Sequence, residues 1–165
     1  MDASFCYGRF DAGTMRLTRY TDYAIRVLLY LGSHTDALAS IRVVAKSFGI
    51  SENHLMKVVQ DLAAAGFIEA VRGRNGGIRL AKPTDQINLG KVLRHTEGLD
   101  ELLECSTCVV APACGLPPVL SEAMAAFVGV FDKYTVEDLV RRRQELRSIL
   151  AAAQSNAIPT PLDAG

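Results

Sequence analysis

Three of the four cysteines in this chain of 165 residues lie close together, in the segment Cys105-Ser-Thr-Cys108-Val-Val-Ala-Pro-Ala-Cys114. Thiols at this density in one loop favour a soft metal centre, either an iron–sulfur cluster or zinc. Structural zinc usually binds two such cysteine pairs, and this chain has one, so the spacing favours an iron–sulfur cluster. Unligated thiols and a disulfide-based redox switch are the alternatives. A fourth ligand must come from elsewhere in the chain, from a partner subunit or from a small molecule, and we expect Cys6 to be unligated.

A second group of side chains has the composition of a DNA-reading surface. Asparagine can bind adenine through two hydrogen bonds, lysine or histidine can reach guanine or phosphate, and arginines beside a glycine-rich turn suit the DNA backbone or minor groove. The candidate DNA-contacting residues are Ser51, Asn53, His54, Lys57, Arg72, Arg74 and Asn75. Taken one at a time, these charges are also explained as solvated surface groups, and His54 can have a purely structural role.

Cap residues and apolar periodicity predict the elements that position these side chains. Helices are expected over residues 18–33, 41–48, 52–65 and 89–96, the first three capped by Thr18, Ser40 and Ser51. The second and third helices are separated by only three residues, beginning with Gly49, which is typical of a helix-turn-helix. The apolar strands 67–71 and 78–80 flank a glycine-rich turn, which predicts a β-hairpin wing that also carries Arg79.

The second half of the chain is predicted to hold the cysteine loop and a long helix over residues 119–133. Apolar side chains recur along that helix at helical spacing, from Leu120 to Phe131, and we expect them to form a dimer interface, with intramolecular core as the alternative. Thr135 with Asp138 predicts the start of another helix, to about residue 152. The expected organisation is a flexible extension 1–14, a winged helix-turn-helix DNA-binding domain 15–97, a cluster-binding loop 98–118, dimerisation helices 119–152 and a disordered tail 153–165.

The net charge of zero conceals a polarised chain. Residues 15–82 contain ten Lys or Arg against five Asp or Glu, whereas residues 83–140 contain three against nine. A basic first half beside an acidic second half indicates that one part of the chain contacts a polyanion and the other does not.

Several classes of protein are disfavoured. The nearest approach to a membrane-spanning run, residues 24–31, is short and contains Arg26, and the N-terminus lacks the pattern of a secretory signal, so we expect a cytoplasmic protein. A glycine-rich cofactor loop, a Ser/His/Asp set and a paired carboxylate site are absent from the sequence, so we do not expect an enzyme. A zinc-stabilised winged-helix adaptor is a further alternative.

Four blocks of sequence, in this order, resemble the Rrf2 family of iron–sulfur transcription regulators, over about residues 15–150. The blocks are Met15-Arg-Leu-Thr-Arg-Tyr-Thr-Asp-Tyr-Ala-Ile-Arg-Val-Leu, Ser51-Glu-Asn-His-Leu-Met-Lys-Val-Val, Val71-Arg-Gly-Arg-Asn-Gly-Gly-Ile-Arg-Leu, and the series Cys114-Gly-Leu, Ala126-Phe, Tyr134-Thr and Asp138-Leu-Val. The resemblance agrees with the predicted fold class, which is mainly α, with a winged helix-turn-helix and a long C-terminal dimerisation helix.

Within that family, the string from Asn53 to Lys57 and the residue Asp22 are most similar to the nitric-oxide-sensing repressors. In such proteins the acidic residue of the Thr-Asp-Tyr motif can supply the fourth iron ligand from the other subunit, and that position is Asp22 here. The alternative for Asp22 is an acidic residue that favours the dipole of its helix.

The resemblance implies further expectations about cofactor, partners and signal. The cofactor would be an iron–sulfur cluster, with 4Fe-4S favoured over 2Fe-2S. The partners would be a second copy of the chain and a palindromic double-stranded DNA operator, because two-fold half-sites need two readers. Nitric oxide would relieve repression. Iron- or redox-responsive regulators of iron homeostasis or cluster biogenesis share this architecture and are the alternative.

Overall fold

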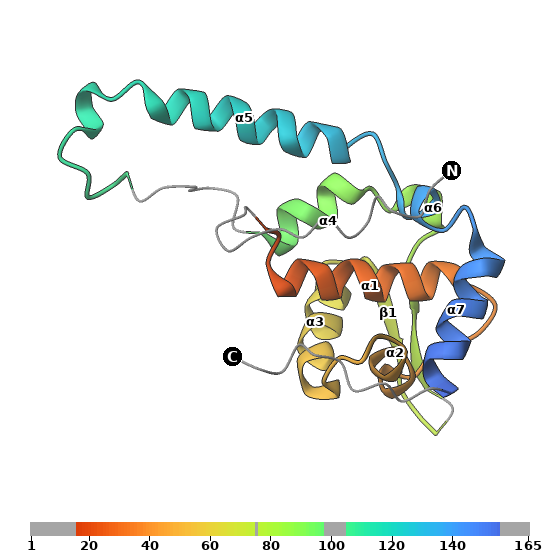
Figure 1. Ribbon diagram of the computed structural model, residues 1–165. Helices are drawn as coiled ribbons and strands as arrows, with labels where there is room; N and C mark the ends of the chain where they lie inside the picture. The colour runs from red at the N-terminus through yellow and green to blue at the C-terminus, as the bar shows by residue number, and fades with distance from the viewer. Residues whose placement is uncertain (1–15, 75, 98–104, 156–165) are drawn as a thin grey trace.

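A computed structural model describes residues 16–74, 76–97 and 105–155 (Figure 1). Its elements, in chain order, are α1 Arg19–Ser33, α2 Ile41–Phe48, α3 Glu52–Ala64, β1 Ile68–Val71, β2 Gly77–Leu80, the 3-10 turn η2 Thr84–Gln86, α4 Leu89–Thr96, the 3-10 turn η3 Ala111–Ala113, α5 Leu116–Phe131, α6 Val136–Leu139 and α7 Arg143–Ser155. The fold is mainly α, as the sequence predicts, and the strands form a two-stranded antiparallel sheet. None of the helices in the described residues is long and apolar enough to cross a membrane.

Helix α1 is the centre of the fold. It contacts α2, α3, α4, α6, α7 and strand β2 (Figure 1). Its side chains Ala24, Val27 and Leu28 have no exposed surface. The hydroxyl of Thr18 accepts a hydrogen bond from the N–H of Thr21 at 3.2 Å, which confirms the predicted cap and the predicted helix.

The predicted helix-turn-helix is confirmed in α2 and α3. The Ser40 hydroxyl caps α2 by accepting a hydrogen bond from the N–H of Val43 at 3.2 Å. Gly49 ends α2 with a φ of +63°, a conformation that costs glycine nothing. The N–H of Ile50 then donates to the carbonyl of Ala45 at 2.9 Å, which closes the helix and turns the chain into α3.

The wing is a short hairpin that rests on the segment before α2. Ala39 and Ile78 of β2 exchange two backbone hydrogen bonds, of 3.0 and 2.8 Å. A Cβ at Gly77 would lie 2.7 Å from the Ala39 carbonyl oxygen, so glycine is required for this close approach. The tip of the hairpin contains Gly73 with a φ of +119°. The helix-turn-helix and the wing are therefore held together by main-chain contacts.

Helix α4 holds the end of α5. Asp132, which directly follows α5, accepts hydrogen bonds from both terminal nitrogens of Arg94 at 2.6 Å. These bonds, more than the charge alone, hold the pKa of Asp132 below its ordinary value. A Cβ at Gly90 of α4 would lie 2.0 Å from Oδ1 of Asp132. The missing side chain at Gly90 therefore lets the two helices meet.

The segment after Thr135 differs from the single helix that the sequence predicts. The capping box of Thr135 and Asp138 is present, but α6 ends at Leu139 and α7 begins only at Arg143. Val140, in the break, packs against Gly32 of α1. Leu150 of α7 is also buried. The turn between the helices brings both side chains into the core, which gives the physical reason for the break.

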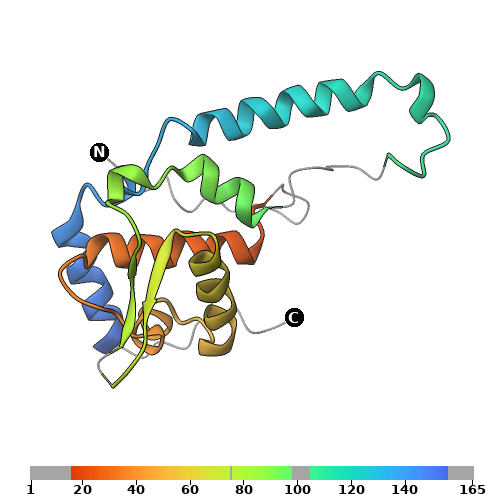
Figure 2. The ribbon, with the colours of Figure 1, turned by 180° about the vertical axis from the view of Figure 1, so that it is seen from behind.

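Helix α7 packs back on α1 and α2. The side-chain amide of Gln154 donates to the Ser47 hydroxyl of α2 at 2.7 Å, and Arg147 forms an ion pair with Asp36 at 2.5 Å. Of the segment 119–152, predicted as dimerisation helices, α6 and α7 therefore lie against the winged helix-turn-helix. Helix α5 instead extends beyond the rest of the fold (Figures 1 and 2).

Several predicted boundaries differ from the structure by one to three residues, and the two largest differences lie in the second half of the chain. Helix α5 begins at Leu116, three residues before the predicted start, because prolines fit the first turn of a helix, where their missing N–H needs no partner. Helix α7 continues to Ser155, into the segment 153–165 predicted as a disordered tail. The predicted extension 1–14, residues 98–104 of the predicted loop and residues 156–165 lie outside the described residues.

The contact at Gly90 yields a test of the fold. Gly90→Ala is expected to lower the free energy of unfolding by about 1–3 kcal/mol, because the added methyl group forces α4 and Asp132 apart. Denaturant unfolding followed by circular dichroism measures the change. In an Asp132→Ala background the same substitution should cost less, because the clashing carboxylate is gone. If Gly90→Ala lowered the free energy of unfolding equally in both backgrounds, the contact with Asp132 would not be the cause of the destabilisation.

Candidate nucleic-acid interface and cysteine loop

Four of the residues predicted to read DNA lie together on the exposed side of α3 and at its cap. Ser51, Asn53, His54 and Lys57 are all exposed, while Leu55 on the opposite face of the helix is fully buried. Ser51 occupies the predicted cap position, but its side chain makes no capping hydrogen bond. The structure thus brings these four predicted residues together at the start of α3.

An acidic residue at the start of α3 has a basic neighbour from α2. Glu52 would repel DNA phosphates, and Arg42 Nε lies 3.4 Å from its Oε2. Both side chains are well exposed, so this ion pair contributes little to stability. Its effect is to offset negative charge at the helix start. Sequence reasoning missed Arg42, because no local signal indicates that it reaches α3.

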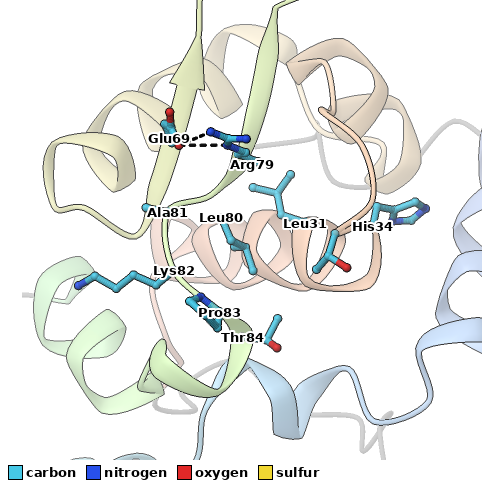
Figure 3. A pocket seen from close by; sticks show the side chains of 10 residues that line it. Leu31, His34, Glu69, Arg79, Leu80, Ala81, Lys82, Pro83 and Thr84 are labelled. Atoms are coloured by element: carbon cyan, nitrogen blue, oxygen red, sulfur yellow. Dashed lines mark hydrogen bonds and ion pairs between the residues drawn. The ribbon is translucent and has the colours of Figure 1, made fainter.

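The wing arginines fall into two groups. Arg72 and Arg74 are exposed at the tip of the hairpin. Arg79, in β2, is instead bound to Glu69 of β1, with its Nε and Nη2 at 3.0 and 2.9 Å from Oε2 (Figure 3). The remaining predicted wing residue, Asn75, lies outside the described residues. The wing therefore offers Arg72 and Arg74 as cations at its tip.

A cavity of about 360 Å³ lies at the base of the wing, between β2 and the end of α1 (Figure 3). Its lining includes Leu31, Leu80 and the paired side chains of Glu69 and Arg79. His34, also in the lining, stacks on the ring of Tyr30 with ring centres 4.3 Å apart. The Glu69–Arg79 pair therefore keeps Arg79 at the base of the wing, away from the tip.

A second cavity, of about 320 Å³, lies between α1 and α3. It is lined mainly by apolar surface, from Arg19, Tyr20, Tyr23, His54, Lys57 and Val58. His54 and Lys57 are predicted DNA contacts, whereas the three α1 residues were not singled out from the sequence. Arg19 is exposed and adds a cation beside the start of α3. In the sequence, the one signal for a role of Arg19 in DNA binding is its position in the basic segment 15–82.

Tyr20 connects this cavity to a carboxylate at the other end of α3. Its hydroxyl donates to Oδ2 of Asp61 at 2.7 Å. Burial of the phenol, the hydrogen bond and the negative charge of Asp61 raise the pKa of Tyr20 to about 12. Tyr20 therefore remains a hydrogen-bond donor at neutral pH. His95 Nε2 of α4 lies 2.8 Å from the same Asp61 oxygen.

The cysteine loop lies at the far end of α5 from α6 (Figure 1). Cys105 and Cys114 are half-buried, Cys108 is exposed, and all three are free thiols. The loop is built from successive tight turns, since Cys108 N–H donates to the Cys105 carbonyl at 3.3 Å and Cys114 N–H donates to the Ala111 carbonyl at 3.3 Å. These turns keep the three cysteines on one short segment.

Asp22, the predicted fourth ligand, lies in the first turn of α1. It forms an ion pair with Arg26, one turn later, at 2.8 Å. Within the described residues, no three His, Cys, Asp or Glu side chains are gathered closely enough to hold a metal ion. The structure of one chain does not bring Asp22 to the cysteines, and its role as a ligand stays a prediction.

The chemistry of the donor set fits an iron–sulfur cluster. Cysteine thiolates are the usual ligands of such clusters, and here three reduced thiols stand on one loop, each at least partly accessible. Asp22 would add a carboxylate oxygen, a harder ligand than a thiolate.

Comparisons with known proteins agree with these features. The model of the Rrf2 family, described as an iron-dependent transcriptional regulator, matches residues 17–142. The HTH-type transcriptional regulator NsrR of Shouchella clausii is 49% identical over 142 residues, which cover 82% of this chain and 95% of that protein. The protein of the same name from Bacillus licheniformis is 44% identical over 143 residues, which cover 83% of this chain and all of that protein.

Solved structures share the fold. The global cysteine regulator CymR of B. subtilis superposes with a TM-score of 0.63 at 25% identity, over 78% of this chain and 98% of that chain. IscR of T. potens superposes with a TM-score of 0.63 at 23% identity, over 81% of this chain and 91% of that chain, which is a likeness of fold alone.

Proposed function

Because the chain belongs to the Rrf2 family of transcription regulators, we propose that it is a DNA-binding repressor controlled by an iron–sulfur cluster that senses nitric oxide. It acts in the cytoplasm as a homodimer on a palindromic double-stranded operator. Nitric oxide is proposed as the signal because the sequence most resembles the nitric-oxide-sensing group and because the relatives described above carry the name NsrR.

The exposed surface at the start of α3 is the observation that carries the DNA-binding proposal. Asn53 and Lys57 stand on the exposed side of the second helix of a helix-turn-helix, where a recognition helix presents donors to base edges. Arg72 and Arg74 at the wing tip supply cations for the DNA backbone or minor groove. Asn53 would specify a base, and the arginines would fix position along the duplex.

The apolar surface of α5 supports the homodimer. Leu116, Val119 and Val130 are exposed on this helix, and Val128 alone among its residues is buried. An exposed apolar helix that extends beyond the fold gains stability by burying its surface against a second copy. Two copies would present two recognition helices to the two halves of a palindromic operator.

The cysteine loop supports control by a cluster. Cys105, Cys108 and Cys114 would bind it as thiolates, and Asp22 of the second copy would complete the set of four. When bound, the cluster supplies iron that is reactive toward nitric oxide. The loop joins α5 directly, so the state of the three thiols bears on the same helix that we propose for the dimer.

An iron- or redox-responsive regulator is the second candidate. It is favoured by the description of the family as iron-dependent. Stoichiometric nitric oxide added to the anaerobic protein separates the two functions. Loss of operator binding supports the nitric-oxide sensor, whereas indifference to nitric oxide with loss of binding on iron chelation supports the iron sensor.

The dimer is tested at Val119. Val119→Glu is expected to convert the dimer to a monomer in light scattering, because the charge would be buried in the proposed interface. Ile149→Glu on α7 is a matched control, since both residues are 58% exposed in the single chain. A Val119→Glu protein that stays dimeric would place the interface elsewhere.

The reading surface is tested with two substitutions. Asn53→Ala should weaken operator binding about 5- to 150-fold and leave binding to unrelated DNA nearly unchanged, because base contacts specify sequence. Arg74→Ala should weaken binding to the operator and to unrelated DNA alike. It should also reduce the slope of log affinity against log salt concentration by about 0.9, because it removes one phosphate contact. Lys133→Ala, two residues after α5, is the charge-matched control. If Asn53→Ala lowered the affinity for operator and for unrelated DNA equally, Asn53 would not be a residue that contacts bases.

Cluster control is tested at the first cysteine of the loop. Cys105→Ala should abolish cluster absorbance and weaken operator binding by about 1–3 kcal/mol relative to the cluster-loaded wild type, a typical coupling energy. Cys6→Ala is the control that should retain both properties. If iron-free Cys105→Ala bound the operator as tightly as the cluster-loaded wild type, control by the cluster would be excluded.

A further inference from the structure

Two adjacent residues of α4 reach opposite neighbours. Arg94 binds Asp132 at the end of α5 through two hydrogen bonds of 2.6 Å. The next residue, His95, contacts Asp61 near the end of α3 at 2.8 Å. One side chain of α4 is thus bound to the end of α5, which follows the cysteine loop, and the next contacts α3, which carries the proposed DNA-reading residues.

Three helices meet at one oxygen atom of Asp61. Oδ2 accepts a hydrogen bond from the Tyr20 hydroxyl of α1 at 2.7 Å and lies 2.8 Å from His95 Nε2 of α4. A carboxylate only accepts hydrogen bonds, so Nε2 carries the proton in this contact. The ring of Phe67 packs edge-on against His95, with ring centres 5.9 Å apart. The hydrogen bond from Tyr20 is partly buried, whereas the His95 contact is exposed, and hydrogen bonds to a carboxylate are stronger than those between neutral groups.

Helices α1 and α4 are also joined directly by hydrogen bonds that do not involve Asp61. Glu97 accepts a hydrogen bond from the backbone N–H of Thr18 at 2.7 Å. The hydroxyl of Thr21, which is fully buried, donates to the hydroxyl of Thr96 at 2.8 Å. These bonds tie the start of α1 to the end of α4, so the two helices form one unit against which α3 is placed.

Asp61 lies on the same side of α3 as the residues proposed to contact DNA. It is one turn after Lys57 and close to two turns after His54, and both of these side chains line the cavity that Tyr20 also lines. A helix of this length moves as a rigid body, so a shift or rotation at Asp61 would change the direction of Lys57 and His54.

We propose that Asp61 is a positioning residue that sets the orientation of α3 against α1 and α4, and that movement of α4 reaches the DNA-reading residues through it. This inference rests on the proposed function, because it requires an operator whose binding depends on the state of the cysteine loop. Tyr20 and His95 are the donors that hold Asp61, and Arg94 connects α4 to α5.

The test compares operator affinity with and without the cluster in the full-length chain. The wild type is expected to show a difference of about 5- to 150-fold between the two states, the usual range for such coupling. Asp61→Ala should reduce this difference to less than about twofold while leaving the absorbance spectrum of the cluster unchanged. Tyr20→Phe, which keeps the ring and its packing, should reduce the difference in the same direction.

Two further variants distinguish orientation from general stability. His95→Ala should act like Asp61→Ala, and His95→Gln should restore part of the difference, because a glutamine amide can donate to Asp61. Asp36→Ala removes an exposed carboxylate that is bound by Arg147 far from α3, and it should leave the difference unchanged. Hydrogen exchange of the cluster-free protein gives an independent readout: Asp61→Ala should speed exchange in the last turn of α3.

The outcomes separate the two proposals. A wild type that fails to bind operator, or binds it equally in both states, overturns the proposed function and the positioning role that depends on it. A wild type with the expected difference, together with folded Asp61→Ala and Tyr20→Phe proteins that keep the same difference, overturns the positioning role alone.

Discussion

Burial of α1 is the constraint on which the rest of the structure depends. Eight of its 15 residues are buried, among them Ala24, Val27 and Leu28, which have no exposed surface, and its exposed side carries the Asp22–Arg26 ion pair. The buried side of this helix needs several neighbours, and the reading helices, the wing, α4 and the returning C-terminal helices each cover part of it. Elements that are distant in sequence are therefore placed in fixed positions relative to one another.

The packing around α1 also separates the basic first half of the chain from the acidic second half. Several exposed basic residues of the first half lie on α3 (Lys57), at the adjacent start of α1 (Arg19) and at the wing tip (Arg72 and Arg74), while α5 and the cysteine loop are on the other side of α1 and α4 (Figure 2). Three acidic residues of the second half are paired with arginines: Asp132 with Arg94, Glu137 with Arg143 and Asp138 with Arg141. Negative charge is thus both distant from a phosphate backbone and partly neutralised where it occurs.

Local signals predicted much of the fold, because caps, glycine stops and prolines act within a few residues. Thr18, Ser40 and Gly49 have the roles that the sequence indicates. The break after Leu139 escaped prediction, because it depends on the contact of Val140 with Gly32, more than a hundred residues earlier. The junction at Asp61 escaped for the same reason, since its three residues come from three helices. The ligand set of the cysteine loop remains a prediction, because Asp22 and the cysteines stay apart within one chain.

The return of α7 onto α2 has a consequence for folding during synthesis. The hydrogen bond from Gln154 to Ser47 joins residues 107 positions apart, and Leu150 fills part of the core around α1. Helix α2, the first helix of the helix-turn-helix, therefore lacks one of its neighbours, α7, until the chain has been synthesised as far as Ser155. Until then, apolar surface on α1 and α2 is open to chaperones and to other nascent chains. The winged helix-turn-helix is contiguous in sequence, but its packing is completed last.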